Sequence, residues 1–202
     1  MTINTMKKIL FFFALILSVA VFSQSKDQQK ILADSKSFVE KFKEKNYDHI
    51  LDLTYPALFE KLDREQLKSA FAAMFENNDA FTMDIVVDKN DKFEVSDIRK
   101  TSDGISYAFV TYPSKFSMTF KEDLDEASKK MMTSALEQQG ISVKFTDTKS
   151  LLASKPGMML ALNDEKTKGE WKYLNHDENN PMYTSIVPKE IMQLAKDYYN
   201  KK

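Results

Sequence analysis

The spacing of apolar residues changes near residue 80, from the period of a helix to the period of a strand. In the segments 31–42, 50–62 and 67–75, apolar residues recur every three or four positions, as on one face of an amphipathic helix. Between 81 and 88 they occupy every second position, which is typical of a strand with one buried face. The chain is therefore predicted to place helices first and a sheet after them.

Local signals set the bounds of the three predicted helices. Ser25 and Gln28 have the spacing of a capping box, so the first helix is expected to open after Ser25 and to end near Asn46. Tyr55-Pro56 interrupts the second helical stretch, because proline lacks an N–H and restricts the residue before it. Asp63 is the predicted N-cap of the third helix.

Turn residues divide the first half of the predicted sheet. Lys89-Asn90-Asp91 is predicted to be a turn, after which a return strand begins over 93–95. Asp103-Gly104 is a hairpin signal ahead of a long strand over 105–112. Pro113 then predicts a bulge or a sheet edge, because proline cannot donate to a ladder, and the alternation continues at Phe116, Met118 and Phe120.

The second half of the sheet is predicted to follow an inserted helix over 122–139. Leu124, Met131, Ala135 and Leu136 are expected to face inward, and Gly140 is the expected left-handed stop. Further strands are predicted at 141–145, 151–153, 158–162 and 171–174, with turns at 155–157 and 163–165. Pro188 is predicted to open a C-terminal helix. Together these elements predict one α+β domain over residues 24–202, with helices on one face of a curved, mostly antiparallel sheet.

The N-terminal segment has the pattern of a secretory signal peptide. Lys7 and Lys8 precede an apolar run from Ile9 to Phe22, and Ser23 follows it. As a helix the run is shorter than the ~30 Å core of a bilayer, which favours a signal peptide over an uncleaved membrane anchor. Residues 1–23 are therefore predicted to be removed, leaving no stable membrane insertion, with Met6 as an alternative start. The chain has no cysteine, so no lipoprotein anchor is expected, and the protein is predicted to be secreted or periplasmic.

The composition excludes several kinds of chemistry. The absence of cysteine excludes disulfides, thiolate catalysis and cysteine-based metal sites, and four glycines leave little for phosphate-binding loops. Lys and Arg number 29 against 30 Asp and Glu, so there is no basic surplus that would indicate nucleic acid as a partner. The segment 88–94 lacks the ligand spacing of a calcium loop, and His176-Asp177-Glu178 has no second histidine nearby. We therefore expect no metal, no cofactor and no catalytic constellation.

The order of the elements resembles the nuclear transport factor two-like superfamily, which includes the ketosteroid isomerases and scytalone dehydratase. The resemblance is carried by the amphipathic segment 31–42, by Tyr47-Asp48 after it, and by the late strand 170–174. It implies a conical fold in which helices and sheet enclose an apolar pocket. The helix over 122–139 and the final helix depart from that pattern, and a shared fold does not transfer an activity.

Five residues are candidates for a ligand site in such a pocket: Tyr55, Phe59, Asp84, Tyr112 and Trp171. The four aromatic residues would supply apolar walls, and Asp84 shares a strand face with Thr82. The favoured hypothesis is an exported, non-catalytic domain that binds a small apolar ligand, a peptide or an envelope protein. A structural envelope protein that self-associates through an exposed sheet face is one alternative.

The other alternative is a cofactor-free acid–base enzyme of the isomerase or dehydratase kind. In such an enzyme a carboxylate on a strand removes a proton, and a tyrosine donates a hydrogen bond to the developing oxyanion. Asp84 would be the base, and Tyr47, Tyr55 and Tyr112 are the possible donors. Their spacing in the sequence does not single out one pair.

Overall fold

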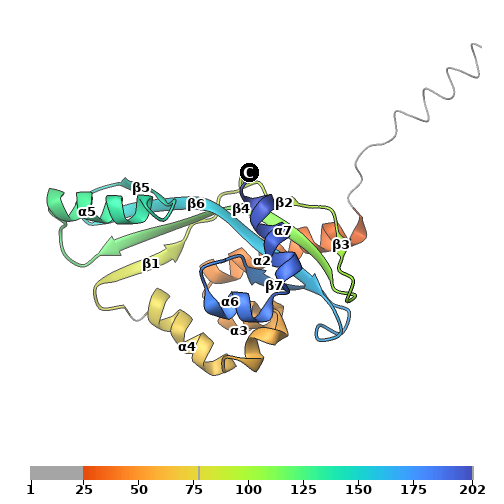
Figure 1. The fold of residues 1–202 in the computed structure, drawn as a ribbon. Helices are drawn as coiled ribbons and strands as arrows, with labels where there is room; N and C mark the ends of the chain where they lie inside the picture. The colour runs from red at the N-terminus through yellow and green to blue at the C-terminus, as the bar shows by residue number, and fades with distance from the viewer. Residues whose placement is uncertain (1–24, 77, 202) are drawn as a thin grey trace, which may run out of the picture.

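The computed structural model describes residues 25–76 and 78–201 and has the α+β fold that the sequence predicts (Figure 1). A helical layer and a long antiparallel sheet form the body, and two central strands extend from it into an arm that carries one further helix. The predicted signal peptide, residues 1–23, lies outside the described residues. No helix within 25–76 or 78–201 is long and apolar enough to cross a bilayer.

The described chain begins with four helices: α2 (Lys26–Lys43), α3 (Tyr47–Leu53), the 3₁₀ helix η1 (Pro56–Glu60) and α4 (Arg64–Phe75). Of these, α2 and α4 begin where the predicted caps Ser25 and Asp63 place them. Ser25 Oγ accepts the Gln28 N–H at 3.1 Å, and Gln28 Oε1 accepts the Ser25 N–H at 2.9 Å, so the capping box is complete. The Asp63 carboxylate accepts two N–H groups of the first turn of α4.

The sheet is built on two long strands that pair with each other. These are β4 (Ser106–Phe120) and β6 (Ser150–Asn163), which run antiparallel in one unbroken register. Along the outer side of β4 lie β1 (Phe81–Ile85), β2 (Glu94–Val95) and β3 (Arg99–Lys100). Along the outer side of β6 lie β5 (Ser142–Phe145) and β7 (Lys172–Asn175). All these pairings are antiparallel.

The predicted return strand after Lys89-Asn90-Asp91 is wrong, although the turn is present. β2 does not pair with β1, because both pair with β4 and run in the same direction along it. The Lys115 ammonium on β4 contacts the Asp88 and Asp91 carboxylates, both at 2.5 Å, and so holds the turn against the sheet. The long edge of β4 therefore takes up three short strands in succession.

The predicted turn at Lys155-Pro156-Gly157 is also wrong, since β6 passes through these residues without interruption. Pro156 lies opposite Pro113 in the β4–β6 ladder, and the backbone groups of both prolines face away from the partner strand. Residues two positions further along each strand show this direction, because their backbone groups face the same side. The Lys115 carbonyl accepts the Val86 N–H, and the Met158 carbonyl accepts the His176 N–H, both outside the ladder. Pro113 therefore marks a sheet edge and not a bulge. Its missing N–H costs no hydrogen bond, because among the described residues no further strand pairs with β4 on that side at this position.

We call this narrow region the waist, residues 112–115 of β4 and 155–157 of β6. In the described part of the chain, no third strand pairs with either segment. The Tyr199 hydroxyl donates to the exposed Pro156 carbonyl at 2.8 Å, which satisfies that part of the open edge. The waist joins the body to the arm.

Three helices follow the first half of the sheet: α5 (Glu126–Glu137), α6 (Pro181–Ile186) and α7 (Lys189–Tyr199). The expectation that Met131 and Ala135 face inward is wrong, because Met131 is 73% exposed and Ala135 is also exposed. Leu136 packs against the arm as predicted, and Met132 packs there in place of Met131. Gly140 follows α5 in the left-handed conformation (φ +72°), as predicted.

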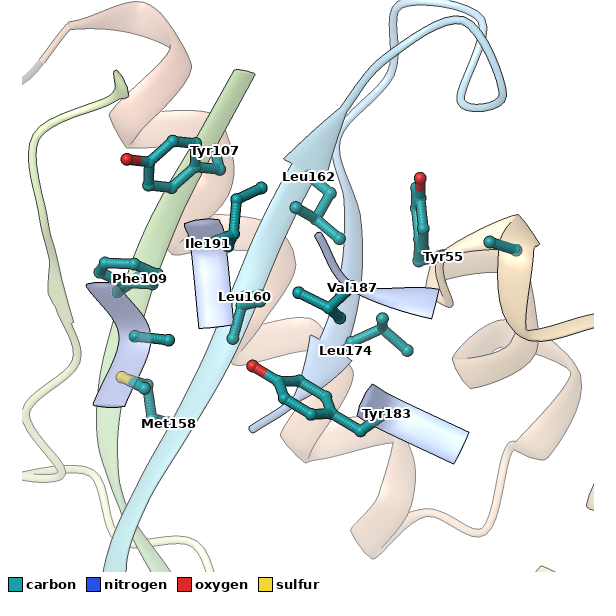
Figure 2. Packing of buried hydrophobic residues seen from close by; sticks show 12 residues of the cluster. Tyr55, Tyr107, Phe109, Met158, Leu160, Leu162, Leu174, Tyr183, Val187 and Ile191 are labelled. Carbon is teal, nitrogen blue, oxygen red and sulfur yellow. The ribbon is translucent and has the colours of Figure 1, made fainter. Parts of the chain in front are cut away.

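The helices cover both faces of the body's sheet, and not one face as expected. On one face α2, α3 and α4 pack on Ala108, Val110, Met159 and Ala161. On the other face α6 and α7 pack on neighbouring side chains of the same strands, and Figure 2 shows Phe109 of β4, Leu160 of β6 and Ile191 of α7 in this cluster. Successive strand residues point to opposite faces, so each long strand contributes to both cores. A third, smaller cluster lies under α5 in the arm.

Candidate functional site

Two adjoining apolar hollows lie between the N-terminal helices and the sheet. The first, which we call the apolar groove, has a volume of about 240 Å³ between α2, α4, β1 and β4. The second, the apolar chamber, has about 350 Å³, lies beside β7 and is bordered by α2, α4, η1 and α6. The walls of both include Phe38, Phe42, Phe71 and Asn175. A ligand in one hollow therefore contacts rings that also face the other.

The helical periodicity of α2 and α4 places these rings. Phe38 and Phe42 are one turn apart on α2, with ring centroids 5.4 Å apart. Phe71 on α4 meets Phe42 edge to face at 5.1 Å. These three rings are the boundary between the groove and the chamber. Met74, also on α4, lines the groove and is 48% exposed.

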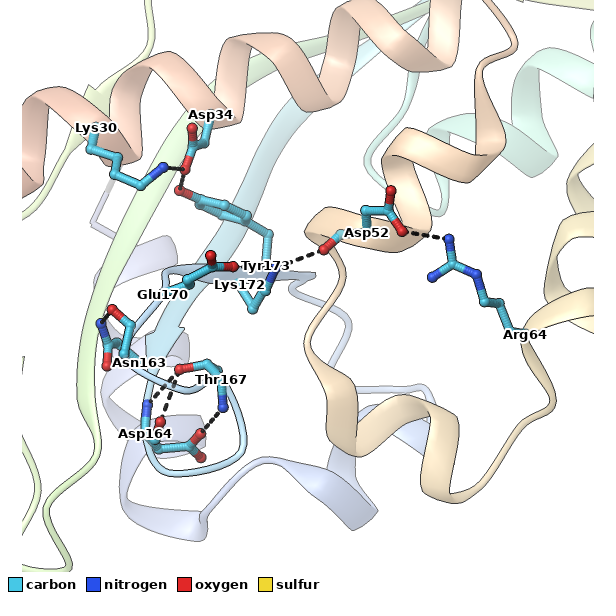
Figure 3. Close-up of polar contacts among 11 residues, drawn as sticks. Lys30, Asp34, Asp52, Arg64, Asn163, Asp164, Thr167, Glu170, Lys172 and Tyr173 are labelled. Carbon is cyan, nitrogen blue, oxygen red and sulfur yellow. Dashed lines mark hydrogen bonds and ion pairs between the residues drawn. The ribbon is translucent and has the colours of Figure 1, made fainter.

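The hydroxyl groups that line the chamber are all hydrogen-bonded. Tyr173 donates to the Asp34 carboxylate on α2 at 3.0 Å, in the network that Figure 3 shows with Lys30. Burial, together with the Asp34 charge, raises the pKa of Tyr173, so its phenol is protonated and acts as the donor. Thr54 donates to the Ile50 carbonyl at 2.8 Å. The hydroxyl groups of the chamber are therefore satisfied within the protein, and most of the remaining wall is apolar.

A polar cleft of about 640 Å³ lies at the waist, next to the apolar groove. The ends of β7 and α7 form one side of the cleft, and Gln138 and Gln139 after α5 form the other. Tyr112, Ser114 and Asn175 line both this cleft and the apolar groove. The Tyr112 hydroxyl donates to Asn175 Oδ1 at 3.3 Å. The polar and apolar hollows therefore adjoin at these three residues.

His176 is the one histidine among the described residues that line the polar cleft, and its pKa is shifted. Burial lowers the pKa of His176, and Lys196 acts in the same direction, while Glu178 and Asp177 oppose it. Its Nδ1 lies 2.9 Å from the hydroxyl of Tyr183, whose own pKa burial raises. The protonated phenol is therefore the donor, and neutral His176 carries its proton on Nε2.

The structure does not bring the five predicted site residues together. Tyr112 lines the groove and the polar cleft. Tyr55 is buried in the cluster under α7 and donates to Asp164 at 2.5 Å, and Trp171 is buried in the cluster under α2. Phe59 is half-buried, with the Arg64 guanidinium 5.7 Å from its ring centroid. Tyr55, Phe59 and Trp171 thus have structural contacts that account for them.

Asp84 lies on the solvated side of β1, where its side chain is 59% exposed. The Lys45 ammonium lies 3.4 Å from its carboxylate and also donates to the Phe75 carbonyl at 3.2 Å. The hydroxyl of Tyr47 is buried and lacks a hydrogen bond of good geometry among the described residues, although the Glu76 carboxylate lies close to it. Burial, then the Glu76 carboxylate and the charge of Asp84, raises the pKa of this phenol. A solvated, ion-paired carboxylate gives no support to acid–base catalysis by Asp84.

Sequence reasoning missed Asn175, which lines the groove, the chamber and the polar cleft. A signal for it was present. Trp171 and Tyr173 lie on the buried face of their strand, and Asn175 continues that period with a polar side chain. A break of this kind in an apolar alternation indicates a polar group at the end of a core.

Within 25–76 and 78–201, no group of three or more His, Asp or Glu side chains is placed to hold a metal ion. Comparisons with protein families, with curated proteins and with solved structures found no match to this chain. Its function must therefore be inferred from its own residues.

Proposed function

We propose that this protein is an exported, non-catalytic domain that binds a small apolar ligand in the apolar groove and the apolar chamber. The observation that carries the proposal is the pair of adjoining hollows that share the rings of Phe38, Phe42 and Phe71. Ligand sites in proteins are mostly apolar concavities with a few polar groups, and the chamber has the size of a small one.

The composition of the walls supports a ligand of low polarity. The hydroxyls of Thr54, Tyr173 and Tyr183 are engaged within the protein and are not available to a polar ligand. An apolar ligand gains about 25 cal/mol for each Å² of apolar surface that it removes from water. Methionine at the rim, as at Met74, adapts to ligands of different shape.

Two sequence features support the wider proposal. The basic, apolar and small-residue order of residues 7–23 favours export and removal of the leader. The order of helices and strands, with a hollow between the two layers, favours a relation to the nuclear transport factor two-like superfamily. N-terminal sequencing of the protein from its source should give a chain that begins near Gln24, and a mature chain that begins at Met1 or Met6 would contradict export by cleavage.

A fluorescent probe tests the binding function. N-phenyl-1-naphthylamine is small, uncharged and apolar, and its emission rises in apolar surroundings, so titration should give saturable binding to one site. The Met74→Lys substitution places a charge at the rim of the groove and should weaken binding about tenfold or more, because an apolar ligand in the groove would remove water from the ammonium. Since Met74 is half-exposed, the variant should fold.

Met131→Lys is the matched control, because Met131 is 73% exposed on α5, on the arm. It should leave the affinity for the probe within about twofold of the original chain. Absence of saturable binding, or equal weakening by both substitutions, would contradict the proposal.

A further inference from the structure

Asn175 is the meeting point of the three hollows. It ends β7 and lines the apolar groove, the apolar chamber and the polar cleft. Its Oδ1 accepts the Tyr112 hydroxyl at 3.3 Å, which leaves the amide nitrogen as a donor. A ligand that extends from the groove past Asn175 therefore passes from apolar walls to polar ones.

The polar cleft is rich in amide side chains and balanced in charge. Its walls include Gln138, Gln139, Asn175 and Asn179, with Lys155 and Asp177 as a cation and an anion. Each amide offers both a donor and an acceptor, which suits neighbouring hydroxyl groups that also donate and accept. Among the described lining residues Lys155 is the one cation that a phosphate or sulfate group would meet, so this lining favours an uncharged head.

Two tyrosine rings, those of Tyr112 and Tyr199, border this cleft. The ring of Tyr112 lies across Gly157 and stacks on Phe93, with ring centroids 5.4 Å apart and planes at 8°. Tyr199 lines the cleft as well, and its hydroxyl is fixed on the Pro156 carbonyl. Rigid aromatic rings of this kind can pack against the C–H faces of a sugar ring while their edges stay polar.

We infer that the ligand is amphipathic, with an apolar chain in the groove and chamber and a neutral, hydroxyl-rich head, such as a glycosyl group, in the polar cleft. This inference rests on the proposed function, because the chain is held in the same apolar hollows. Tyr112, Ser114 and Asn175 line both the apolar groove and the polar cleft, so they lie where the chain and the head of the ligand would join.

Competition among ligands with one chain and different heads tests this inference. Decyl maltoside, decyl sulfate and decyltrimethylammonium, each below its micelle concentration, should displace N-phenyl-1-naphthylamine from the purified protein. Decyl maltoside should bind about tenfold more tightly than either charged compound. 1-Decanol, which has the chain without the sugar, measures binding of the chain.

A substitution in the polar cleft separates the head from the chain. Gln138→Ala with Gln139→Ala removes two exposed amides from the cleft and should weaken decyl maltoside about tenfold, with 1-decanol unchanged within about twofold. Gln66→Ala, an exposed position on α4 that lines none of the three hollows, is the matched control.

The outcomes distinguish the two proposals. If none of the decyl compounds and no apolar probe binds, the proposed function is wrong, and this inference is wrong with it. If all decyl compounds bind equally well, or if the Gln138 and Gln139 substitutions leave decyl maltoside unchanged, only the glycosyl-head inference is overturned. If decyl maltoside is preferred and that preference is lost in the double variant, both are supported.

Discussion

Replacing Gly157 with alanine should destabilise the protein through a clash at the waist. The added Cβ would lie 2.8 Å from Cζ and 3.0 Å from Cε2 of Tyr112, and 3.1 Å from Cβ of Ser114. Such distances are well inside van der Waals contact, so the Tyr112 ring must move away. The backbone at Gly157 is not left-handed, and the cost therefore comes from lack of space alone.

The contacts of Tyr112 determine how much the Gly157→Ala substitution lowers the free energy of unfolding. Overpacking of a filled site costs about 1–3 kcal/mol. Displacement of the ring also disturbs its stack on Phe93, and an aromatic pair is worth about 0.5–1.5 kcal/mol. The hydrogen bond to Asn175 is long and exposed, so its loss adds little. We expect Gly157→Ala to lower the free energy of unfolding by about 2–3 kcal/mol.

Urea unfolding of four proteins measures this effect: the original chain, Gly157→Ala, Tyr112→Ala and the double variant. Without the ring, the new methyl group approaches only Ser114, and the alanine should then cost less than about 1 kcal/mol. The two substitutions should therefore be non-additive by at least about 1 kcal/mol. A cost below about 0.5 kcal/mol in the original chain, or the same cost in both backgrounds, would refute the clash.

Three further predictions concern other parts of the molecule. Burial lowers the pKa of His176, so the unfolded state binds a proton before the folded state does, and the free energy of unfolding should fall as the pH drops below 6.5. Urea midpoints measured from about pH 7.5 to about pH 5 should show this fall in the control His49→Gln, which keeps His176. The His176→Gln variant should lack the part of the fall that comes from His176. Tyr173→Phe removes the hydrogen bond to the carboxylate on α2 and should cost about 1–2 kcal/mol in urea unfolding, whereas no measurable cost would contradict the role given to that bond. Met132→Lys should cost about 2 kcal/mol or more and Met131→Lys less than about 0.5 kcal/mol, and the reverse order in thermal unfolding would place the wrong face of α5 on the arm.

The sequence predicts the helices well because their signals are local. Ser25, Asp63 and Gly140 each fix a helix boundary through contacts within a few residues, and the structure has all three. The short helix α6 has similar signals, since Asn180 is its N-cap and Pro181 its first residue. It was missed because six residues are too few to show a helical period.

The errors in the sheet arise where a tertiary contact overrides a local rule. Lys155-Pro156-Gly157 has the composition of a turn, but β4 supplies a partner along the whole segment. Pro156 is tolerated because its side of β6 has no neighbouring strand at that point, and Gly157 provides space for Tyr112. None of these conditions can be read from the turn residues themselves.

The candidate site was predicted in kind but only partly in its residues. An apolar hollow between helices and sheet was expected, and one of the five candidates, Tyr112, lines a hollow. Tyr55 and Trp171 instead fill cores on opposite faces of the sheet. Aromatic residues serve equally well in a core and in a cavity wall, so composition cannot separate the two roles. The separation depends on which helix covers which face.

The pairing of β4 with β6 has a consequence for how this chain reaches its native state. Even the pair nearest in sequence within that ladder, Thr119 and Ser150, is 31 residues apart. Such distant pairing loses the entropy of loop closure before any contact between the strands forms. In contrast, α5 with β5 and the helices α2 to α4 can form from residues that are close in sequence. Those local units should therefore gain protection from hydrogen exchange early in refolding, and the amides that bond β4 to β6 should gain it last and together.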